Sequence, residues 1–262
     1  MLVVIDIGNT NITFGFVRGR QKYSVYNFPT RLIKKQPFFK KELCRFMRVK
    51  RINPLCIQSA VICSVVPKAE SVLERNLKKI FASVKSSFLG RDITIPIRNC
   101  YKKPHQVGND RLVNALGVKA NYRLPALVVD FGTATTIDVI SRDGAYQGGI
   151  IVPGIRMSLE SLHEKTALLP LLTAGKPHAI LGRDTKNSIL SGVFYGYSFL
   201  VDGFINALAG NTLSSKTVIA TGGNLKIMKS LCRKIDIFDP YLTLKGIEMA
   251  FKNKKIKENK SK

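Results

Sequence analysis

Two short turns carry the residue types best suited to phosphate chemistry. Residues 6–10 read Asp-Ile-Gly-Asn-Thr after the apolar residues 3–5, and residues 130–133 read Asp-Phe-Gly-Thr after the apolar residues 127–129. A carboxylate at the tip of a strand can bind a cation, while closely spaced backbone N–H groups and threonine hydroxyls can bind the oxygens of a polyphosphate. Either turn alone is better explained as the polar tip of a hairpin.

The order of elements around the two turns is the same. Each apolar strand leads through its Asp-x-Gly turn into a second strand, residues 12–17 in the first copy and residues 137–140 in the second. Each second strand ends at a turn that contains a glycine, Gly19 or Gly144. Such a repeat is typical of a duplicated domain. We therefore expect two strand-tip turns that face each other across a cleft and hold one triphosphate.

The other segments predict helices that alternate with strands. Residues 39–47 have the apolar spacing of an amphipathic helix, and residues 59–66 form an apolar run of strand length closed by Pro67. A second helix capped by Ser71 follows, and then a short edge strand at residues 93–97. Helices between buried strands imply a parallel or mixed sheet covered on both faces, so the expected fold class is α/β.

Composition narrows the class of protein. A chain of 262 residues with 45% apolar residues can form one large domain or two modest ones. No apolar run approaches the roughly 20 residues that cross a bilayer, and no basic leader begins the chain, so we expect a cytoplasmic protein that binds no membrane. The five cysteines include no Cys-x-x-Cys pair, which favours neither a disulfide framework nor a zinc site.

The net charge of +25 is the one global anomaly, and it raises a nucleic-acid hypothesis. The basic residues gather in residues 31–51 and in the tail 252–262. The first run contains phenylalanines, but their spacing is that of the buried face of a helix with a lysine-rich outer face. The tail has the composition of a solvated end. Nucleic acid is therefore not an expected partner, and an anionic substrate would also benefit from the positive field.

Between the two copies, residues 108–111 read Gly-Asn-Asp-Arg directly before a segment of helical spacing. Asp110 is explained by a place in the first turn of a helix, where the dipole favours a carboxylate, with a solvated Arg111 beside it. The alternative is chemical. The carboxylate would accept a proton from a substrate hydroxyl, and the guanidinium would bind an anionic substrate.

Taken in order, these motifs closely resemble those of a type III pantothenate kinase. They are Asp-x-Gly-Asn-Thr at 6–10, Gly-x-Asp-Arg at 108–111, Asp-Phe-Gly-Thr-Ala-Thr at 130–135, Gly-Gly-x-x-x-Pro-Gly at 148–154 and Thr-Gly-Gly at 221–223. The resemblance implies two similar actin-like (ribonuclease-H-like) domains with mixed sheets and a nucleotide cleft between them. It also implies ATP-dependent phosphorylation of pantothenate to 4′-phosphopantothenate, the first step of coenzyme A biosynthesis.

The resemblance further implies roles for individual residues. Asp110 would be the proton acceptor, Asp130 would bind a monovalent cation, K⁺ or NH₄⁺, and Asp6 would lie near the Mg²⁺ that accompanies ATP. ATP would be bound by Asp6, Ile7, Gly8, Asn9, Thr10, Asn11, Ile12, Thr13 and Thr133. Pantothenate would be bound by Tyr101, Gly108, Asn109, Asp110, Arg111 and Thr185, the last across the interface of a homodimer.

A dimer interface also has a candidate segment. Residues 189–201, shortly after Thr185, have the spacing of a helix-packing face, which suits a dimer and a core helix equally well. The face consists of Leu190, Val193, Phe194, Tyr197 and Leu200.

Two residues depart from the family pattern, because Asn109 stands where alanine is usual and Thr13 where some members carry lysine. The expected domains are residues 1–115 and 116–251, followed by a disordered basic tail at 252–262. One alternative is a catalytically silent homologue that acts as a nucleic-acid-associated transcriptional regulator. Another is a sugar or acetate kinase of the same superfamily. The four charged site residues favour the pantothenate kinase over both: Asp6, Asp110, Arg111 and Asp130.

Overall fold

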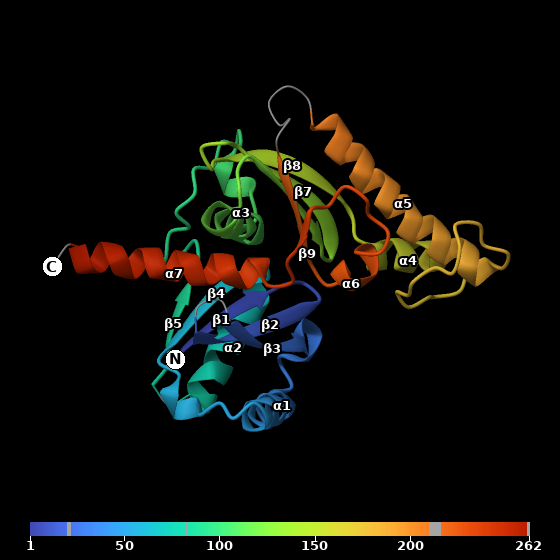
Figure 1. The fold of residues 1–262 in the computed structure, drawn as a ribbon. Coiled ribbons are helices and arrows are strands. Elements are labelled where there is room, and N and C mark those ends of the chain that lie inside the picture. Colours follow the sequence, from blue (N-terminus) through green and yellow to red (C-terminus); the bar gives the residue numbers. More distant parts are fainter. Residues whose placement is uncertain (20–21, 82, 210–215, 261–262) are drawn as a thin grey trace. The chain divides into compact units, whose positions relative to one another are not determined.

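The computed structural model describes residues 1–19, 22–81, 83–209 and 216–260, and it divides into two compact units. The first unit holds Met1–Ile97, Lys103–Ala120 and the chain from Leu242 onward. The second holds Arg98–Lys102 and Asn121–Tyr241. Each unit is built on a five-stranded sheet (Figure 1).

The first sheet has the strand order β3-β2-β1-β4-β5. β1 pairs antiparallel with β2 and parallel with β4, so the sheet is mixed. On the two outer sides, β2 pairs antiparallel with β3, and β4 pairs parallel with β5. The strands are β1 Leu2–Ile7, β2 Asn11–Gly19, β3 Lys22–Pro29, β4 Ser59–Ser64 and β5 Lys85–Phe88.

The second sheet repeats this topology with the order β10-β9-β6-β7-β8. β6 takes the place of β1, because it pairs antiparallel with β7 and parallel with β9. The repeat confirms the α/β fold of two similar halves that the two Asp-x-Gly turns predict. The strands are β6 Ala126–Phe131, β7 Ala134–Ile140, β8 Tyr146–Pro153, β9 Thr217–Thr221 and β10 Ile237–Phe238.

Helices cover both faces of the first sheet (Figure 1). One face packs on α1 (Gln36–Val49) and α2 (Pro67–Ile80), and the other packs on α3 (Asn109–Asn121) and α7 (Leu242–Lys260). This follows from the alternation of apolar residues along the central strands, which gives each face its own core. Short 3₁₀ helices occupy Thr30–Leu32, Pro54–Cys56 and Pro104–Gln106.

α3 and α7 approach each other closely. A Cβ on Gly117 would lie 2.8 Å from the carbonyl oxygen of Leu242, and a Cβ on Gly246 would overlap the carbonyl of Val113. The hydroxyl of Thr243 also donates to Oδ1 of Asn114 at 2.8 Å. Two glycines and one partly buried hydrogen bond thus fix α3, which begins within the Gly-Asn-Asp-Arg motif, against the C-terminal helix.

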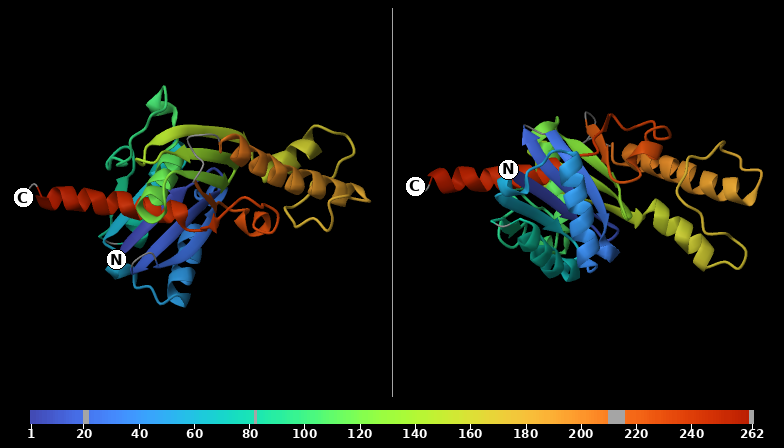
Figure 2. Two further views of the ribbon diagram at one scale, coloured as in Figure 1. Left: turned by 45° about the horizontal axis from the view of Figure 1, so that its top comes forward. Right: turned by 90° about the horizontal axis from the view of Figure 1, so that it is seen from below.

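The second sheet packs through one face on α4 (Ile155–Glu164), α5 (Thr185–Ala207) and the short α6 (Leu225–Met228). α4 and α5 lie side by side, and the segment that joins them loops out beyond their ends (Figure 2). Among the described residues α5 is the one helix long and apolar enough for a membrane span, although half of its most apolar window is buried in the protein. That burial is typical of a core helix.

Two local expectations differ from the structure. The fifth strand is β5, Lys85–Phe88, and residues 93–97 contribute only an isolated bridge from Ile93 to Leu89. β5 has a polar sequence and obtains its pairing from β4, so apolar patterning does not reveal it. α2 begins at Pro67, a residue suited to a first helical turn, so Ser71 lies inside the helix and does not cap it.

The end of the chain also differs from expectation. α7 runs from Leu242 to Lys260, through most of the predicted disordered tail, and Lys252 pairs with Glu248 one turn earlier, Nζ to Oε1 at 2.5 Å. α7 belongs to the first compact unit rather than to the second. The division at residue 115 into two folding domains stays a prediction.

Candidate active site

Asp6 lies at the end of β1 on the face of the sheet that packs on α3 and α7. Alternation along β1 places Ile5 and Ile7 in the core beneath α1 and α2, and Val4 and Asp6 on the opposite face. The strand register sets Asp6 beside Thr13 of β2 and Cys63 of β4. The half-buried Asp6 carboxylate therefore belongs to the sheet end and not to a free loop.

Backbone bonds hold the first turn in a fixed shape. The N–H of Gly8 donates to the carbonyl of Asn11 at 3.0 Å. Thr30 binds the turn twice, since its hydroxyl donates to the carbonyl of Gly8 at 2.7 Å and its N–H donates to the carbonyl of Thr10 at 3.0 Å. Within the predicted ATP segment, the side chains of Ile7 and Ile12 are buried in the core, so these two residues can offer a ligand only their backbone.

Asp110 lies in the first turn of α3, with its carboxylate turned back over Gly108. Its Oδ1 accepts the backbone N–H of Arg111 at 2.8 Å, and a Cβ on Gly108 would overlap the same oxygen. Burial raises the pKa of the Asp110 carboxyl above its usual value, although the backbone N–H and the guanidinium of Arg111 lower it. Arg111 is itself 7% exposed, so the alternative in which this arginine is solvated is wrong.

Cys63 shows that Asp6 and Asp110 belong to one neighbourhood of the first unit. Burial raises the pKa of the Cys63 thiol well above its usual value, and the charges of both Asp6 and Asp110 raise it further. One carboxylate at a strand end and one at a helix start thus lie near the same buried thiol. A cluster of carboxylates at a strand end beside a helix N-terminus suits cation-assisted phosphate chemistry and proton abstraction.

Asn109 has a partner that the sequence does not reveal. Its side-chain Nδ2 donates to the carbonyl of Leu89 at 3.1 Å. The amide also lies against Gly90, whose φ of +83° is in the region that favours glycine. The bond joins residues that are 20 positions apart, so no local pattern could predict it.

Asp130 occupies in the second unit the place that Asp6 has in the first. It lies on β6 opposite Thr136 of β7 and Thr221 of β9. A Cβ on Gly222 would lie 2.5 Å from the Asp130 Oδ1, and a Cβ on Gly132 would lie 3.3 Å from it. Gly222 has a φ of +103°, which an L side chain rarely adopts. The missing side chains at both glycines thus make room for the Asp130 carboxylate itself.

The donor set fits a cation that takes oxygen ligands. No group of three or more His, Cys, Asp and Glu residues that could hold a metal ion occurs in the described part of the chain. A cation at Asp130 would therefore combine one carboxylate with backbone, hydroxyl, water or phosphate oxygens. Such a set would suit a cation that takes oxygen ligands, such as K⁺ or Mg²⁺.

The remaining predicted residues of the second unit lie at separate positions. Thr133 is exposed at the tip of the turn between β6 and β7, and its carbonyl lies where a Cβ on Gly154 would stand. Tyr101 packs on Tyr146, with ring centroids 6.4 Å apart. Thr185 is the exposed first residue of α5, behind the capping side chain of Asp184.

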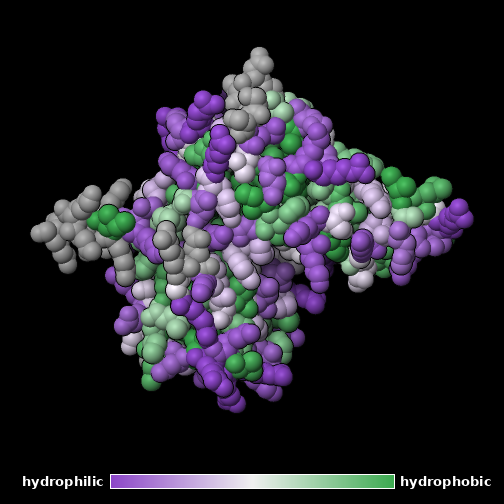
Figure 3. Space-filling model, in the orientation of Figure 1, coloured by the Kyte–Doolittle hydropathy of each residue, from purple (hydrophilic) through white to green (hydrophobic). Residues whose placement is uncertain are grey.

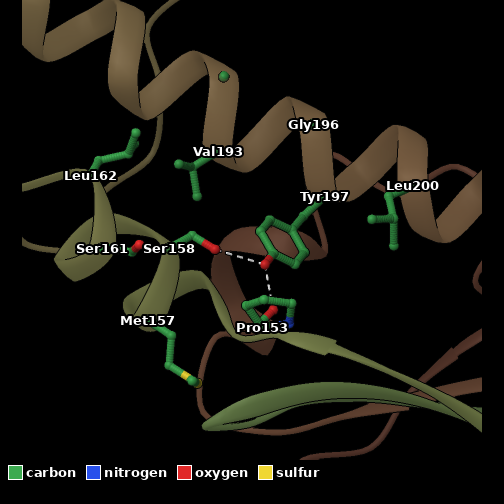
Figure 4. A pocket seen from close by; sticks show the side chains of 10 residues that line it. Pro153, Met157, Ser158, Ser161, Leu162, Val193, Gly196, Tyr197 and Leu200 are labelled. Atoms are coloured by element: carbon green, nitrogen blue, oxygen red, sulfur yellow. Dashed lines mark hydrogen bonds between the residues drawn. The ribbon is translucent and has the colours of Figure 1, made fainter. Parts of the chain in front are cut away.

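A groove of about 630 Å³ lies between α4 and α5 (Figure 4). At its floor the Tyr197 hydroxyl donates to the carbonyl of Pro153, and the hydroxyls of Tyr197 and Ser158 lie 2.8 Å apart. Along α5 the groove is open, because a Cβ on Gly192 or Gly196 would meet nothing within 4 Å. None of the predicted site residues lines this groove.

Comparisons of the sequence agree with the motifs. A family model described as type III pantothenate kinase matches residues 2–207. The type III pantothenate kinase of Syntrophus aciditrophicus is 37% identical over 252 residues, which cover 96% of this chain and 99% of the relative. The protein of the same name from Listeria welshimeri is 34% identical over 255 residues, which cover 97% of this chain and 98% of the relative.

Solved structures with low sequence identity share the fold. A putative 2-dehydro-3-deoxygalactonokinase from Sinorhizobium meliloti aligns with a TM-score of 0.59 at 10% identity, over 97% of this chain and 96% of that one. Ta0583, an archaeal actin homolog, aligns with a TM-score of 0.51 at 11% identity, over 96% of this chain and 99% of that one. These likenesses establish an actin-like fold and nothing more.

Proposed function

The chain belongs to the type III pantothenate kinase family, and we propose that it transfers the terminal phosphoryl group of ATP to the 4′-hydroxyl of pantothenate, with Asp110 as the proton acceptor. The observation that carries this assignment is the carboxylate of Asp110, which is partly buried at the start of α3 beside Gly108 and has a raised pKa. A base with a raised pKa is better matched to a hydroxyl proton than an ordinary surface aspartate is.

The reaction needs one proton acceptor and one leaving group. The 4′-oxygen of pantothenate forms a bond to the γ-phosphorus of ATP, the bond from that phosphorus to the β,γ-bridging oxygen breaks, and ADP leaves. The hydroxyl proton passes to a carboxylate oxygen of Asp110. Because phosphoryl transfer depends mainly on positioning and on charge neutralisation, the protein has little further chemistry to perform.

Arg111 binds the carboxylate of pantothenate. Its guanidinium is planar and can form two parallel bonds to a carboxylate, and its burial at the start of α3 leaves it little conformational freedom. Tyr101 and Thr185 contribute to the pantothenate site, as the family resemblance implies. Gly108 belongs to the same site by making room for the Asp110 carboxylate.

ATP is bound by residues 6–13 and by Thr133. The fixed shape of the first turn, which Thr30 holds by two bonds, supports this assignment because preorganised backbone groups bind phosphate without a cost of ordering. Mg²⁺ at Asp6 and K⁺ or NH₄⁺ at Asp130 would neutralise phosphate charge. The cation at Asp130 is supported by the position of this carboxylate near the end of β6, which matches that of Asp6 near the end of β1.

A homodimer is part of the proposal. Of the two explanations of the apolar face on α5, the core helix is favoured, since Leu190, Val193, Phe194 and Tyr197 are all buried in the second unit. Other residues of the same region support a dimer better, namely the exposed apolar side chains Leu168, Leu171, Ile180, Leu181 and Phe199. Hydrophobic residues gather near the free ends of α4 and α5 in the space-filling view (Figure 3). Exposed apolar patches on soluble enzymes commonly mark interfaces.

The test is an assay of the purified protein with ATP, Mg²⁺, K⁺ and pantothenate, coupled to the release of ADP and read by mass spectrometry for phosphopantothenate. We expect product only when pantothenate is present. Omission of pantothenate and replacement by a sugar or acetate are the controls. A protein that makes no phosphopantothenate but binds nucleic acid tightly at physiological salt would be a regulator rather than a kinase.

A further inference from the structure

The side chain of Asn109 joins α3 to the turn that follows β5. Its amide donates to the carbonyl of Leu89 at 3.1 Å and lies close to Gly90, where an added Cβ would stand 2.6 Å from Nδ2 and 3.0 Å from Oδ1. Gly90 is the natural residue for this contact, because its positive φ and its missing side chain both make room for the amide.

The Leu89 carbonyl is attached to a rigid part of the sheet. Leu89 is 3% exposed, and its N–H donates to the carbonyl of Ile62 on β4 at 2.8 Å. The following turn is closed by the N–H of Gly90, which donates to the carbonyl of Ile93 at 2.8 Å, and by the side chain of Asp92, which accepts the N–H of Phe88 at 2.8 Å. The Asn109 amide thus bonds to a fixed point of the first unit.

The bond acts on the residue next to Asn109. Asp110 follows directly, and its carboxylate is packed on Gly108 and bonded to the N–H of Arg111. Successive side chains of a helix point about 100° apart, so an anchor on residue 109 sets the direction in which residue 110 points. A small rotation of this first turn would move the carboxylate towards solvent or away from its substrate.

We propose that Asn109 is a positioning residue, which holds Asp110 in its reactive orientation through the Leu89 carbonyl and Gly90 and does not itself contact pantothenate. The inference rests on the proposed function, since it takes Asp110 as the base. It gives a reason for an asparagine in the Gly-Asn-Asp-Arg motif, because alanine at this place could not form the bond. On this proposal Asn109 is not one of the residues that bind pantothenate.

The charged and titratable groups around Asp110 are defined. Arg111 is its neighbour on α3 and lowers its pKa. Cys63 on β4 is a third group, because its pKa, raised first by burial, is raised further by the charges of Asp6 and Asp110. Loss of the Asn109 anchor changes none of these groups. A change in the pKa of Asp110 in an Asn109 variant therefore reports a change in its position or burial.

The first experiment compares Asn109→Ala with the wild type. We expect kcat to fall about tenfold, the effect of one lost hydrogen bond, with little change in KM for pantothenate. The acid limb of the pH profile of kcat/KM should move to lower pH, because a less confined carboxylate is better solvated. The matched control is Asn53→Ala, which removes an exposed amide that accepts the N–H of Leu55 at 3.0 Å and should leave both readouts unchanged.

The second experiment is a double-mutant cycle with Gly90→Ala. In the wild type the new methyl group meets the Asn109 amide and strains the backbone, whereas in Asn109→Ala only the backbone strain remains. We expect Gly90→Ala to lower kcat more in the wild type than in Asn109→Ala. Equal effects in the two backgrounds would show that the contact does not position Asp110.

A third readout separates this inference from the proposed function. The pKa of Asp110 is measured in the free protein by carboxyl ¹³C NMR, with Asp110→Asn to assign the signal. It should lie closer to its usual value in Asn109→Ala than in the wild type, even if pantothenate proves not to be the substrate. An unchanged pKa together with an unchanged kcat and a raised KM for pantothenate would make Asn109 a substrate contact and overturn the proposal.

Discussion

The carboxylate of Asp110 lies against Gly108, so that a methyl group on Gly108 would overlap its Oδ1 oxygen. The same oxygen accepts the N–H of Arg111 at 2.8 Å, and it is therefore held from two sides within one turn of chain. Asp130 has a matching relation to Gly222 in the second unit. In both units a glycine makes the room that a candidate functional carboxylate occupies.

Gly108→Ala should reduce catalysis more than it reduces stability. The methyl group must displace the carboxylate, and a misplacement of about 1 Å can lower a rate by about 10²-fold. We expect kcat for pantothenate phosphorylation to fall by about that factor while the melting temperature changes little. The matched control is Gly203→Ala on the exposed side of α5, where an added Cβ meets nothing within 4 Å. Equal losses of activity in both variants would contradict the steric explanation.

Activity should require K⁺ or NH₄⁺, and Na⁺ should not replace them. Asp130 ends a buried strand, and a cation would offset its charge beside a triphosphate. Gly222→Ala should raise the K⁺ concentration needed for half-maximal activity, because the methyl group would stand 2.5 Å from the Asp130 Oδ1. The positive φ of Gly222 should also cost about 1–3 kcal/mol in stability. The measurement is a titration with KCl and with NaCl at constant ionic strength. Equal turnover in the two salts would contradict a K⁺ site at Asp130.

The sequence predicts the carboxylates at the strand ends well, and the reason is local. Three apolar residues before Asp6 and before Asp130 form strands that the structure contains, and the glycines that follow make the turns. The same is true of α1, whose buried residues Phe39, Leu43 and Met47 all belong to the predicted apolar face, while its fourth member, Phe46, is partly buried. Each of these features depends on a spacing of a few residues, which the sequence displays directly.

Other features depend on partners that are distant along the chain. The polar β5 is a strand because β4 offers it backbone partners, and α7 packs on the first sheet although it follows the second. The apolar stripe on α5 has the same spacing whether it faces a core or a dimer partner, and only the structure shows that most of it is buried. The Asn109 anchor belongs to the same class, since its acceptor is a backbone carbonyl in another segment.

The protein should be a homodimer in solution. Leu181 and Phe199 are 72% and 58% exposed, and they lie near Thr185 and along α5. Leu181→Glu and Phe199→Glu should therefore shift the protein to a monomer by light scattering at micromolar concentration. Leu55→Glu is the control, because Leu55 is 79% exposed in the first unit and should not affect assembly. A wild type that is monomeric and active would exclude a pantothenate site shared between subunits.

Asp110→Asn should abolish most of the activity and leave ATP binding almost unchanged. The substitution keeps the size of the side chain and a hydrogen-bond acceptor for Arg111, but it removes the basicity that receives the hydroxyl proton. General-base catalysis contributes about 10²- to 10⁴-fold, so pantothenate-dependent ADP release should fall by that much. Nucleotide affinity, measured by calorimetry, depends on residues 6–13 and Thr133 and should stay within about twofold of the wild type. A near-normal turnover would show that Asp110 is not the proton acceptor and serves only at the start of α3.

The same variant should be more stable than the wild type at neutral pH. Burial raises the pKa of Asp110 in the folded protein above the ordinary value of 3.8, so folding favours its protonated form. The cost of burying the charged form is therefore complete above the folded pKa and disappears as the pH falls through that pKa towards 3.8. Asp110→Asn removes this cost, so its advantage in the midpoint of urea unfolding should be largest near neutral pH and should vanish in acid.

Asp143→Asn is the control of opposite sign, because Ser141 and Arg98 lower the pKa of the exposed Asp143 carboxyl. Loss of this carboxylate should lower the stability of the protein only at the higher pH. If Asp110→Asn is less stable than the wild type at neutral pH, the interactions of the Asp110 carboxylate with Arg111 stabilise the fold by more than its burial costs. The carboxylate would then be a stabilising group of the fold.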